Sequence, residues 1–213
     1  MIGIIILIIL GIVSLVNLFG EYKDSFILKC LSKPLLMPLL IAYYVLTAQD
    51  INILIILALF FGLLGDIFLL KSEQLNIMLG IASFFLGHVF YITYFLISID
   101  FTFPPYFYLI IIPYIIIILG LFKLLYHHMG ELRIPGLLYM IIITLMSFTT
   151  AIRYDAVKFI PYLLPLIGSL LFITSDTVLA IGLFKKEVKY GGVIVMFTYI
   201  LAQTLITIGV TLS

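Results

Sequence analysis

The sequence predicts an all-α, polytopic membrane protein, a bundle of eight transmembrane helices, and two observations support this. First, 65% of the 213 residues are hydrophobic and only 10% are charged, with a mean hydropathy of +1.37, whereas a soluble domain is roughly half apolar and about a quarter charged. Second, the apolar runs stay apolar on every side over about twenty residues, the length of an α-helix that crosses a bilayer. Strands of a membrane barrel would instead alternate apolar and polar residues.

The first apolar run, Ile2 to Phe19, is predicted to be a retained helix. A signal peptide would start with basic residues, but none precedes this run, and its length of about eighteen residues is close to that of a full span. Seven further helices are expected at Ser32 to Ala48, Asn52 to Leu70, Asn76 to Ser98, Pro104 to Tyr126, Arg133 to Ile152, Ile160 to Phe184 and Tyr190 to Leu212. The connections between them are too short to hold a soluble domain, so residues 1–213 should form a single transmembrane helical domain.

Charges in the connections predict the orientation, because Lys and Arg accumulate in cytoplasmic loops. The even-numbered connections contain only Arg153 and Lys158. The odd-numbered connections and the adjoining helix ends contain Lys23, Lys29, Lys33, Lys71, Lys123, Arg133, Lys185, Lys186 and Lys189. We therefore expect both termini to be extracytoplasmic. The protein is expected to be a multi-pass protein of the cell membrane, specifically the bacterial plasma membrane.

Charge and cysteine content indicate few partners. The formal net charge of +1 gives no electrostatic bias toward nucleic acid, so no nucleic-acid partner is expected. Cys30, the single cysteine, cannot form an internal disulfide. The sequence predicts no particular oligomeric state.

Two aspartates interrupt apolar runs, each directly after a small residue: Gly65-Asp66 and Ser175-Asp176. An ionisable side chain in the middle of a span costs about 2.5 kcal/mol or more, so it usually faces the bundle interior and marks a functional site. With a helical rise of about 1.5 Å per residue, Asp66 should lie about 8 Å and Asp176 about 13 Å from the cytoplasmic ends of their helices.

Other polar residues are expected near the same level. Tyr139 is expected about 9 Å from the cytoplasmic end of its helix, and Lys33 at the cytoplasmic start of the helix Ser32 to Ala48. His88 and Gln203 are expected deeper, at roughly 18 to 20 Å. These last two would form the deep end of a cavity that opens to the cytoplasmic leaflet. Simpler roles remain open: the aspartates could orient helices by pairing with Lys33 or Tyr139, His88 could be a hydrogen-bonded packing residue, and Lys33 could extend to the headgroups or bind a lipid phosphate.

Two nearby carboxylates in a low dielectric do not both ionise easily, so one can act as a general acid beside a general base. Such a pair could protonate an acid-labile bond and activate a water, and a proton-coupled transporter would use the same groups. The sequence contains no HExxH, GxSxG or glycine-rich phosphate loop, and we expect no cofactor and no metal. A metal site built from Asp66, Asp176 and His88 remains geometrically open.

Five blocks of sequence carry a family resemblance. They are Lys33-Pro34-Leu35, Gly62 to Leu69 (GLLGDIFL), Phe85 to Ile92 (FLGHVFYI), Phe172 to Ala180 (FITSDTVLA) and Ala202 to Ile206 (AQTLI). Their order, their spacing and the eight-helix layout resemble the YhhN family, which includes the lysoplasmalogenases. The resemblance implies hydrolysis of the vinyl ether bond of a lysoplasmalogen to a fatty aldehyde and a glycerophospho-alcohol.

The resemblance also suggests roles for the polar residues, with a lysophospholipid as substrate and membrane lipid as surroundings. One of Asp66 and Asp176 would donate the proton and the other would activate water. Lys33 would hold the phosphate, and the positioning residues would be His88, Tyr139, Ser175 and Gln203. Two alternatives stay open: a proton-coupled transporter of a small solute or a lipid that uses the same aspartates, and a lipid-binding protein without turnover.

Overall fold

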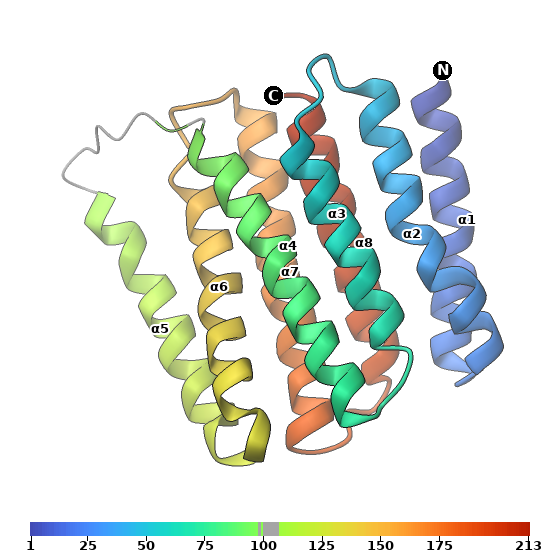
Figure 1. The fold of residues 1–213 in the computed structure, drawn as a ribbon. Coiled ribbons are helices and arrows are strands. Elements are labelled where there is room, and N and C mark those ends of the chain that lie inside the picture. Colours follow the sequence, from blue (N-terminus) through green and yellow to red (C-terminus); the bar gives the residue numbers. More distant parts are fainter. Residues whose placement is uncertain (98, 100–106) are drawn as a thin grey trace.

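The computed structural model describes residues 1–97, 99 and 107–213, and over this part of the chain it consists of α-helices and two short 3₁₀ turns (Figure 1). The elements are α1 (Ile2–Tyr22), α2 (Phe26–Thr47), α3 (Ile53–Phe68), α4 (Gln74–Ile97), α5 (Phe107–Leu125), η1 (Tyr126–His128), η2 (Gly130–Leu132), α6 (Arg133–Ala151), α7 (Phe159–Phe184) and α8 (Gly191–Thr211). The predicted all-α class and the eight helices are confirmed. Ser98 and Pro104, at predicted helix ends, lie outside the described residues.

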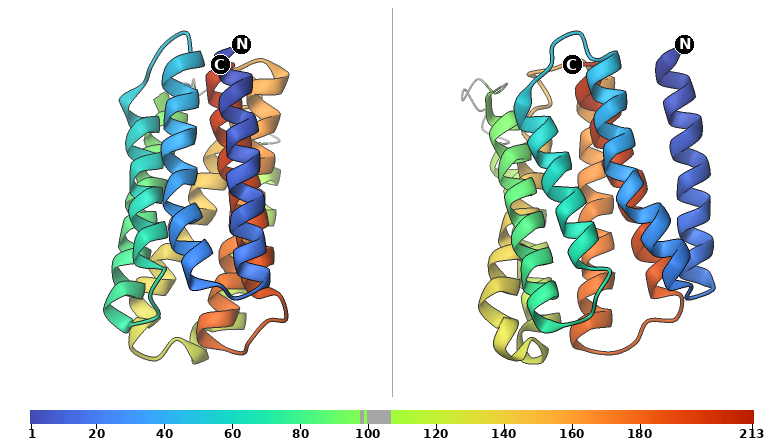
Figure 2. Two further views of the ribbon diagram at one scale, coloured as in Figure 1. Left: turned by 90° about the vertical axis from the view of Figure 1, so that its right-hand side faces the viewer. Right: turned by 45° about the vertical axis from the view of Figure 1, so that its right-hand side comes forward.

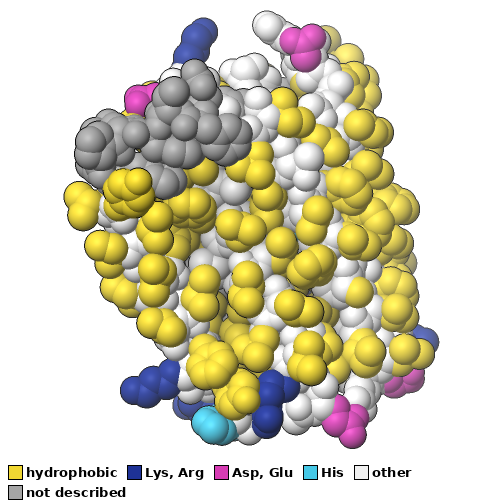
Figure 3. All heavy atoms as spheres, turned by 60° about the vertical axis from the view of Figure 1, so that its left-hand side comes forward, with side chains coloured by type: hydrophobic (Ala, Val, Ile, Leu, Met, Phe, Trp, Pro, Cys, Tyr) yellow, Lys and Arg dark blue, Asp and Glu magenta, His cyan; other side chains and the backbone are white. Residues whose placement is uncertain are grey.

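The helices run alternately up and down the bundle, so both termini lie at one end (Figures 1 and 2). The α1–α2, α3–α4, α5–α6 and α7–α8 connections lie at the opposite end, which we call the odd-loop end. Along the bundle wall, apolar side chains cover most of the face shown in Figure 3, and charged side chains gather at the two ends. This distribution matches a protein surrounded by lipid; which end faces the cytoplasm stays a prediction.

Seven of the helices in the described part of the chain are long and apolar enough to cross a membrane. The exception is α3, which has 16 residues and would be about 24 Å long, shorter than the bilayer core of about 30 Å. The Asn52 side chain accepts a hydrogen bond from the Leu54 amide at 3.0 Å and begins the helix. The helix ends at Phe68, so Asp66 lies in its last turn, and spanning by all eight helices stays a prediction.

The first connection differs from its prediction. Residues 20–31 were expected to form it, but only residues 23–25 separate α1 from α2. Glu21 and Lys29 lie in the helix ends, and Asp24 lies in the connection. Lys29, in the first turn of α2, has its Nζ 2.7 Å from Asp24 Oδ1 and 3.9 Å from Glu21 Oε2. As a result, Lys33 lies inside α2 rather than at its mouth, and Pro34 also lies within the helix.

The helices pack around one main core to which α2, α3, α4, α6, α7 and α8 contribute most of the buried side chains and α1 contributes Leu10. Close approach of α7 and α8 depends on Gly168, because a Cβ there would lie only 2.7 Å from the Ala202 carbonyl oxygen. Gly65 acts in the same way between α3 and α4, where a Cβ would lie 2.5 Å from the Phe84 ring. Small residues at such crossings are typical of membrane helix pairs.

Replacing Gly168 with Leu should therefore destabilise the bundle by about 1 to 3 kcal/mol, because the added side chain forces α7 away from α8. The measurement is thermal unfolding of the detergent-purified protein. Gly11→Leu is the matched control, since a Cβ at Gly11 would have no atom within 4 Å. Equal unfolding temperatures for the two variants would contradict the close helix contact.

Candidate active site

Two groups of polar side chains lie inside the bundle near the odd-loop end. The first joins Lys33 of α2, Asp66 of α3 and Tyr199 of α8. The second joins His88 of α4, Tyr139 of α6 and Asp176 of α7. The small residue before each aspartate has a structural function. Gly65 lets Phe84 pack against α3, and Ser175 Oγ donates to the Val195 carbonyl of α8 at 2.9 Å.

Asp66 is held by two partners and is only 1% exposed. Its Oδ2 accepts a hydrogen bond from the Tyr199 hydroxyl at 2.9 Å. Its Oδ1 lies 3.7 Å from Nζ of Lys33, whose side chain is also buried. A carboxylate away from water must be paired and hydrogen-bonded to stay ionised, and both conditions are met here.

Asp176 is held differently. The Tyr139 hydroxyl donates to its Oδ2, and Nε2 of His88 lies 3.1 Å from the same hydroxyl. Because a tyrosine hydroxyl has a single hydrogen, the bond to Asp176 requires His88 Nε2 to donate. His88 therefore carries its proton on Nε2, and its buried Nδ1 has no hydrogen-bond partner among the described residues.

The two aspartates thus have different electrostatic surroundings. Lys33 lies within ion-pair distance of Asp66. In residues 1–97, 99 and 107–213, no Lys, Arg or His nitrogen lies within 4.0 Å of a carboxylate oxygen of Asp176. Asp66 is consequently the better-stabilised anion of the pair, and Asp176 is the better candidate for a neutral, protonated acid.

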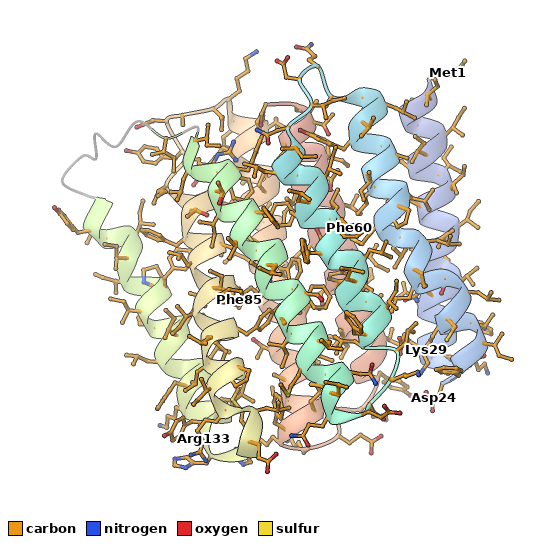
Figure 4. The ribbon with its side chains drawn as sticks, in the orientation of Figure 1. Met1, Asp24, Lys29, Phe60, Phe85 and Arg133 are labelled. Carbon is orange, nitrogen blue, oxygen red and sulfur yellow. The ribbon has the colours of Figure 1, made fainter. Side chains whose placement is uncertain are left out.

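Both carboxyl groups border one polar cavity of about 550 Å³, which also reaches Lys33, Ser175 and Tyr199. It extends to exposed residues at the odd-loop end, where its rim includes Glu21, Asp24, Lys29, Glu187 and Tyr190. Figure 4 shows Asp24 and Lys29 at the lower end of α1 and α2. The hydrogen bond from Lys29 holds the pKa of Asp24 below its usual value, so this rim pair stays charged at neutral pH.

A sequence model of the YhhN family matches residues 28–210. The chain belongs to the YhhN family. No curated protein and no solved structure matches the sequence. The matched segment contains every predicted site residue, from Lys33 to Gln203, whereas α1 lies outside it. In this YhhN protein α1 still contributes to the cavity rim through Glu21, and Asn17 Nδ2 attaches it to α2 by a hydrogen bond to Ser32 Oγ at 3.0 Å.

His88 and Gln203 were predicted to form the deep end of the cavity, and the structure of this YhhN protein places them elsewhere. His88 and Gln203 are each 1% exposed, and neither is among the residues that line the polar cavity. His88 contacts Tyr139 instead, and Gln203 Oε1 accepts a hydrogen bond from the Tyr91 hydroxyl at 2.7 Å. Both therefore support tyrosines rather than form the deep end of the cavity.

The sequence prediction missed two tyrosines, Tyr199 and Tyr91. Tyr199 lies four residues before Gln203 on α8, and Tyr91 lies three residues after His88 on α4, so each shares a helix face with a predicted site residue. That spacing was the available signal.

The metal alternative finds no support in the YhhN fold. Among the described residues, no three His, Cys, Asp or Glu side chains come close enough together to hold a metal ion. His88 in particular directs Nε2 at Tyr139 rather than at a shared site with the aspartates.

Proposed function

We propose that this YhhN protein is a lysoplasmalogenase-like hydrolase that cleaves the vinyl ether bond of a lysoplasmalogen by acid/base catalysis. The observation that carries the proposal is a pair of aspartates at one cavity, Asp66 buried and Asp176 partly buried. Among the described residues, only Asp66 of the two has a Lys, Arg or His nitrogen within 4.0 Å. Family membership supports the reaction class. The fatty aldehyde and a glycerophospho-ethanolamine or -choline are the products.

The polar part of the substrate is proposed to enter the cavity from the odd-loop end. Lys33 Nζ is a donor in the cavity, and an ammonium group has three hydrogens, so it can hold a phosphate while it stays near Asp66. Lys29 at the rim offers a second cation whose present partner, Asp24, is exposed. These two ammonium groups lie at the rim and in the interior of the cavity, so each can contact the phosphate as the headgroup moves toward the aspartates.

Asp176 is proposed to be the general acid. Tyr139 occupies its Oδ2, which leaves Oδ1 to carry the proton that the substrate receives. The His88–Tyr139 hydrogen bond fixes the direction of the tyrosine hydroxyl, so the free oxygen of Asp176 keeps one orientation. Tyr139 and His88 are therefore positioning residues. Ser175 has the same role through its hydrogen bond to α8, and Gln203 through its hydrogen bond with Tyr91.

The reaction then follows from these positions. Asp176 protonates the β-carbon of the vinyl ether, and the double-bond electrons form the new C–H bond and leave an oxocarbenium ion. Asp66, anionic beside Lys33, stabilises this cation and takes a proton from the attacking water. The resulting hemiacetal collapses to the aldehyde, and its hydroxyl proton is transferred to the departing glycerol oxygen. The proton that Asp66 took from water then returns to Asp176, so both carboxyl groups regain their starting states.

The first test is product analysis. Detergent-purified protein should release free fatty aldehyde from a lysoplasmalogen and no product from the ester-linked lysophospholipid, because only the vinyl ether is activated by carbon protonation. A chelator should not change the rate if the aspartates alone do the chemistry.

Other outcomes would contradict the proposal. Loss of activity with chelator would implicate a metal. Absence of aldehyde, together with proton-coupled solute uptake in proteoliposomes, would favour the transporter that uses the same two aspartates.

A further inference from the structure

A second hollow lies next to the polar cavity. It is a narrow crevice of about 60 Å³, bounded by α4, α5, α6 and α7 near the odd-loop end. The two spaces share five lining residues: Leu69, Phe84, Asp176, Leu179 and Leu183. Asp176 therefore lies where a polar and an apolar space meet.

The crevice is lined almost wholly by hydrocarbon. Leu121, Met129, Met140, Ile173, Ala180 and Phe184 form much of its wall. Thr177 also borders it, but its hydroxyl donates to the Ile173 carbonyl at 2.7 Å, and the Tyr139 hydroxyl is taken by Asp176. A group bound in the crevice contacts hydrophobic side chains, and this lining favours a hydrocarbon chain. The carboxyl of Asp176 is the polar group that such a chain can approach.

The size of the crevice limits how much chain it can hold. A volume of about 60 Å³ is well below the roughly 300 to 1,000 Å³ of a usual ligand pocket, so a long chain does not fit entirely. Met129 and Met140 are unbranched and adaptable, which allows the space to widen by a small amount. The first few carbons of a chain fit, and the remainder must lie beyond the crevice.

We propose that the crevice is the hydrocarbon-chain subsite of the active site, and that it binds the carbons next to the reactive bond of a single-chain ether lipid. The inference rests on the proposed function. With the headgroup phosphate near Lys33 and the first chain carbons beside Ala180, the vinyl ether lies at Asp176. The affinity for the lipid should therefore fall when bulky groups are added to the chain near the ether bond. It should not depend on the length of the chain beyond the first carbons.

The variant that tests the subsite is Ala180→Phe. Ala180 lies one turn after Asp176 on α7 and lines the crevice, so a phenyl ring there occupies the space of the first carbons. The matched control is Ala82→Phe, on the exposed face of α4. The ligand is a saturated 1-O-hexadecyl lysophosphoethanolamine, which cannot be hydrolysed by carbon protonation, measured by equilibrium binding to protein in nanodiscs.

Ala180→Phe should weaken binding of the hexadecyl lipid about tenfold, from the loss of about two buried methylenes, and leave binding of the 1-O-methyl analogue unchanged. Ala82→Phe should bind both like the wild type. If wild-type protein fails to bind the hexadecyl lipid, or Ala180→Phe binds it as tightly as wild type, the subsite is wrong.

A test on the unaltered protein removes any dependence on the folding of the variant. A hexadecyl chain with two methyl branches on its second carbon should bind wild-type protein about tenfold more weakly than the linear chain, whereas the same branches near the far end should have no effect. If both branched lipids bound equally weakly, the crevice would not be the hydrocarbon-chain subsite. If these binding results appear as expected but no aldehyde forms from a lysoplasmalogen, the subsite stands and the hydrolase proposal fails.

Discussion

Asp176→Asn should lower the rate of aldehyde release from a lysoplasmalogen by a factor of about 10² to 10⁴, the usual contribution of a general acid. Asparagine has the same shape, and its Oδ1 can still accept the Tyr139 hydrogen bond, but it has no proton to give to carbon. Because the substitution keeps the local contacts, the unfolding temperature and the binding of the hexadecyl ether lipid should stay close to those of the wild type.

The control for this variant is Asp155→Asn, an exposed aspartate at the opposite end of the bundle, which should leave the rate unchanged. Steady-state kinetics of aldehyde formation provide the measurement. Near-normal turnover by Asp176→Asn would remove Asp176 from the chemistry.

Asp66→Asn should abolish turnover and also destabilise the protein by about 3 to 5 kcal/mol, because it leaves Lys33 as a buried charge without its anion. Replacing both partners, Lys33→Met with Asp66→Asn, should recover much of the stability and none of the activity. Thermal unfolding and aldehyde release, measured on the two single variants and the double variant, separate the two effects.

The exposed pair at the cavity rim is the matched control. Asp24→Asn breaks a contact with Lys29 of 2.7 Å, but Asp24 is exposed to solvent, so its removal should leave the unfolding temperature nearly unchanged. If Asp66→Asn were as mild as Asp24→Asn, the buried ion pair would not be a structural feature of the site.

The levels of the site residues could be predicted from the sequence, and so could two of their partners. Counting residues along helices of predicted direction placed Asp66, Asp176 and Tyr139 near one end, because the helical rise is nearly constant. The structure pairs Asp66 with Lys33 and Asp176 with Tyr139, the two partners that the sequence analysis left open.

The direction in which a side chain points around its helix does not follow from the helical rise. In runs that are apolar on all sides, no hydrophobic stripe marks the inner face. The spacing of Tyr199 from Gln203 places the two on one face of α8, but it does not indicate that Tyr199 contacts Asp66.

The start of α2 was predicted too late. The helix was expected to begin at Ser32, yet it begins at Phe26, and both Lys29 and Pro34 lie within it. Lys29 is tolerated because it forms an ion pair at the helix end, and Pro34 is tolerated because membrane helices can compensate for the lost hydrogen bond. The early start of α2 is what places Lys33 inside the bundle, where it meets Asp66.

The apolar crevice had no signal in the sequence either. Its wall combines residues of four helices, such as Leu121, Met140 and Ala180, that are unremarkable in any one segment. Hydropathy reports that a residue avoids water, but it does not distinguish contact with lipid from contact with a neighbouring helix or with a bound chain.

The most direct test of the central claim is to run the reaction in D₂O and analyse the aldehyde by mass spectrometry after immediate reduction to the alcohol. Protonation of the vinyl ether carbon predicts one deuterium on the carbon next to the former carbonyl, at a rate that falls about 10² to 10⁴-fold in Asp176→Asn. Aldehyde formed without that deuterium, or formed equally fast by the variant, would contradict proton transfer to carbon by Asp176.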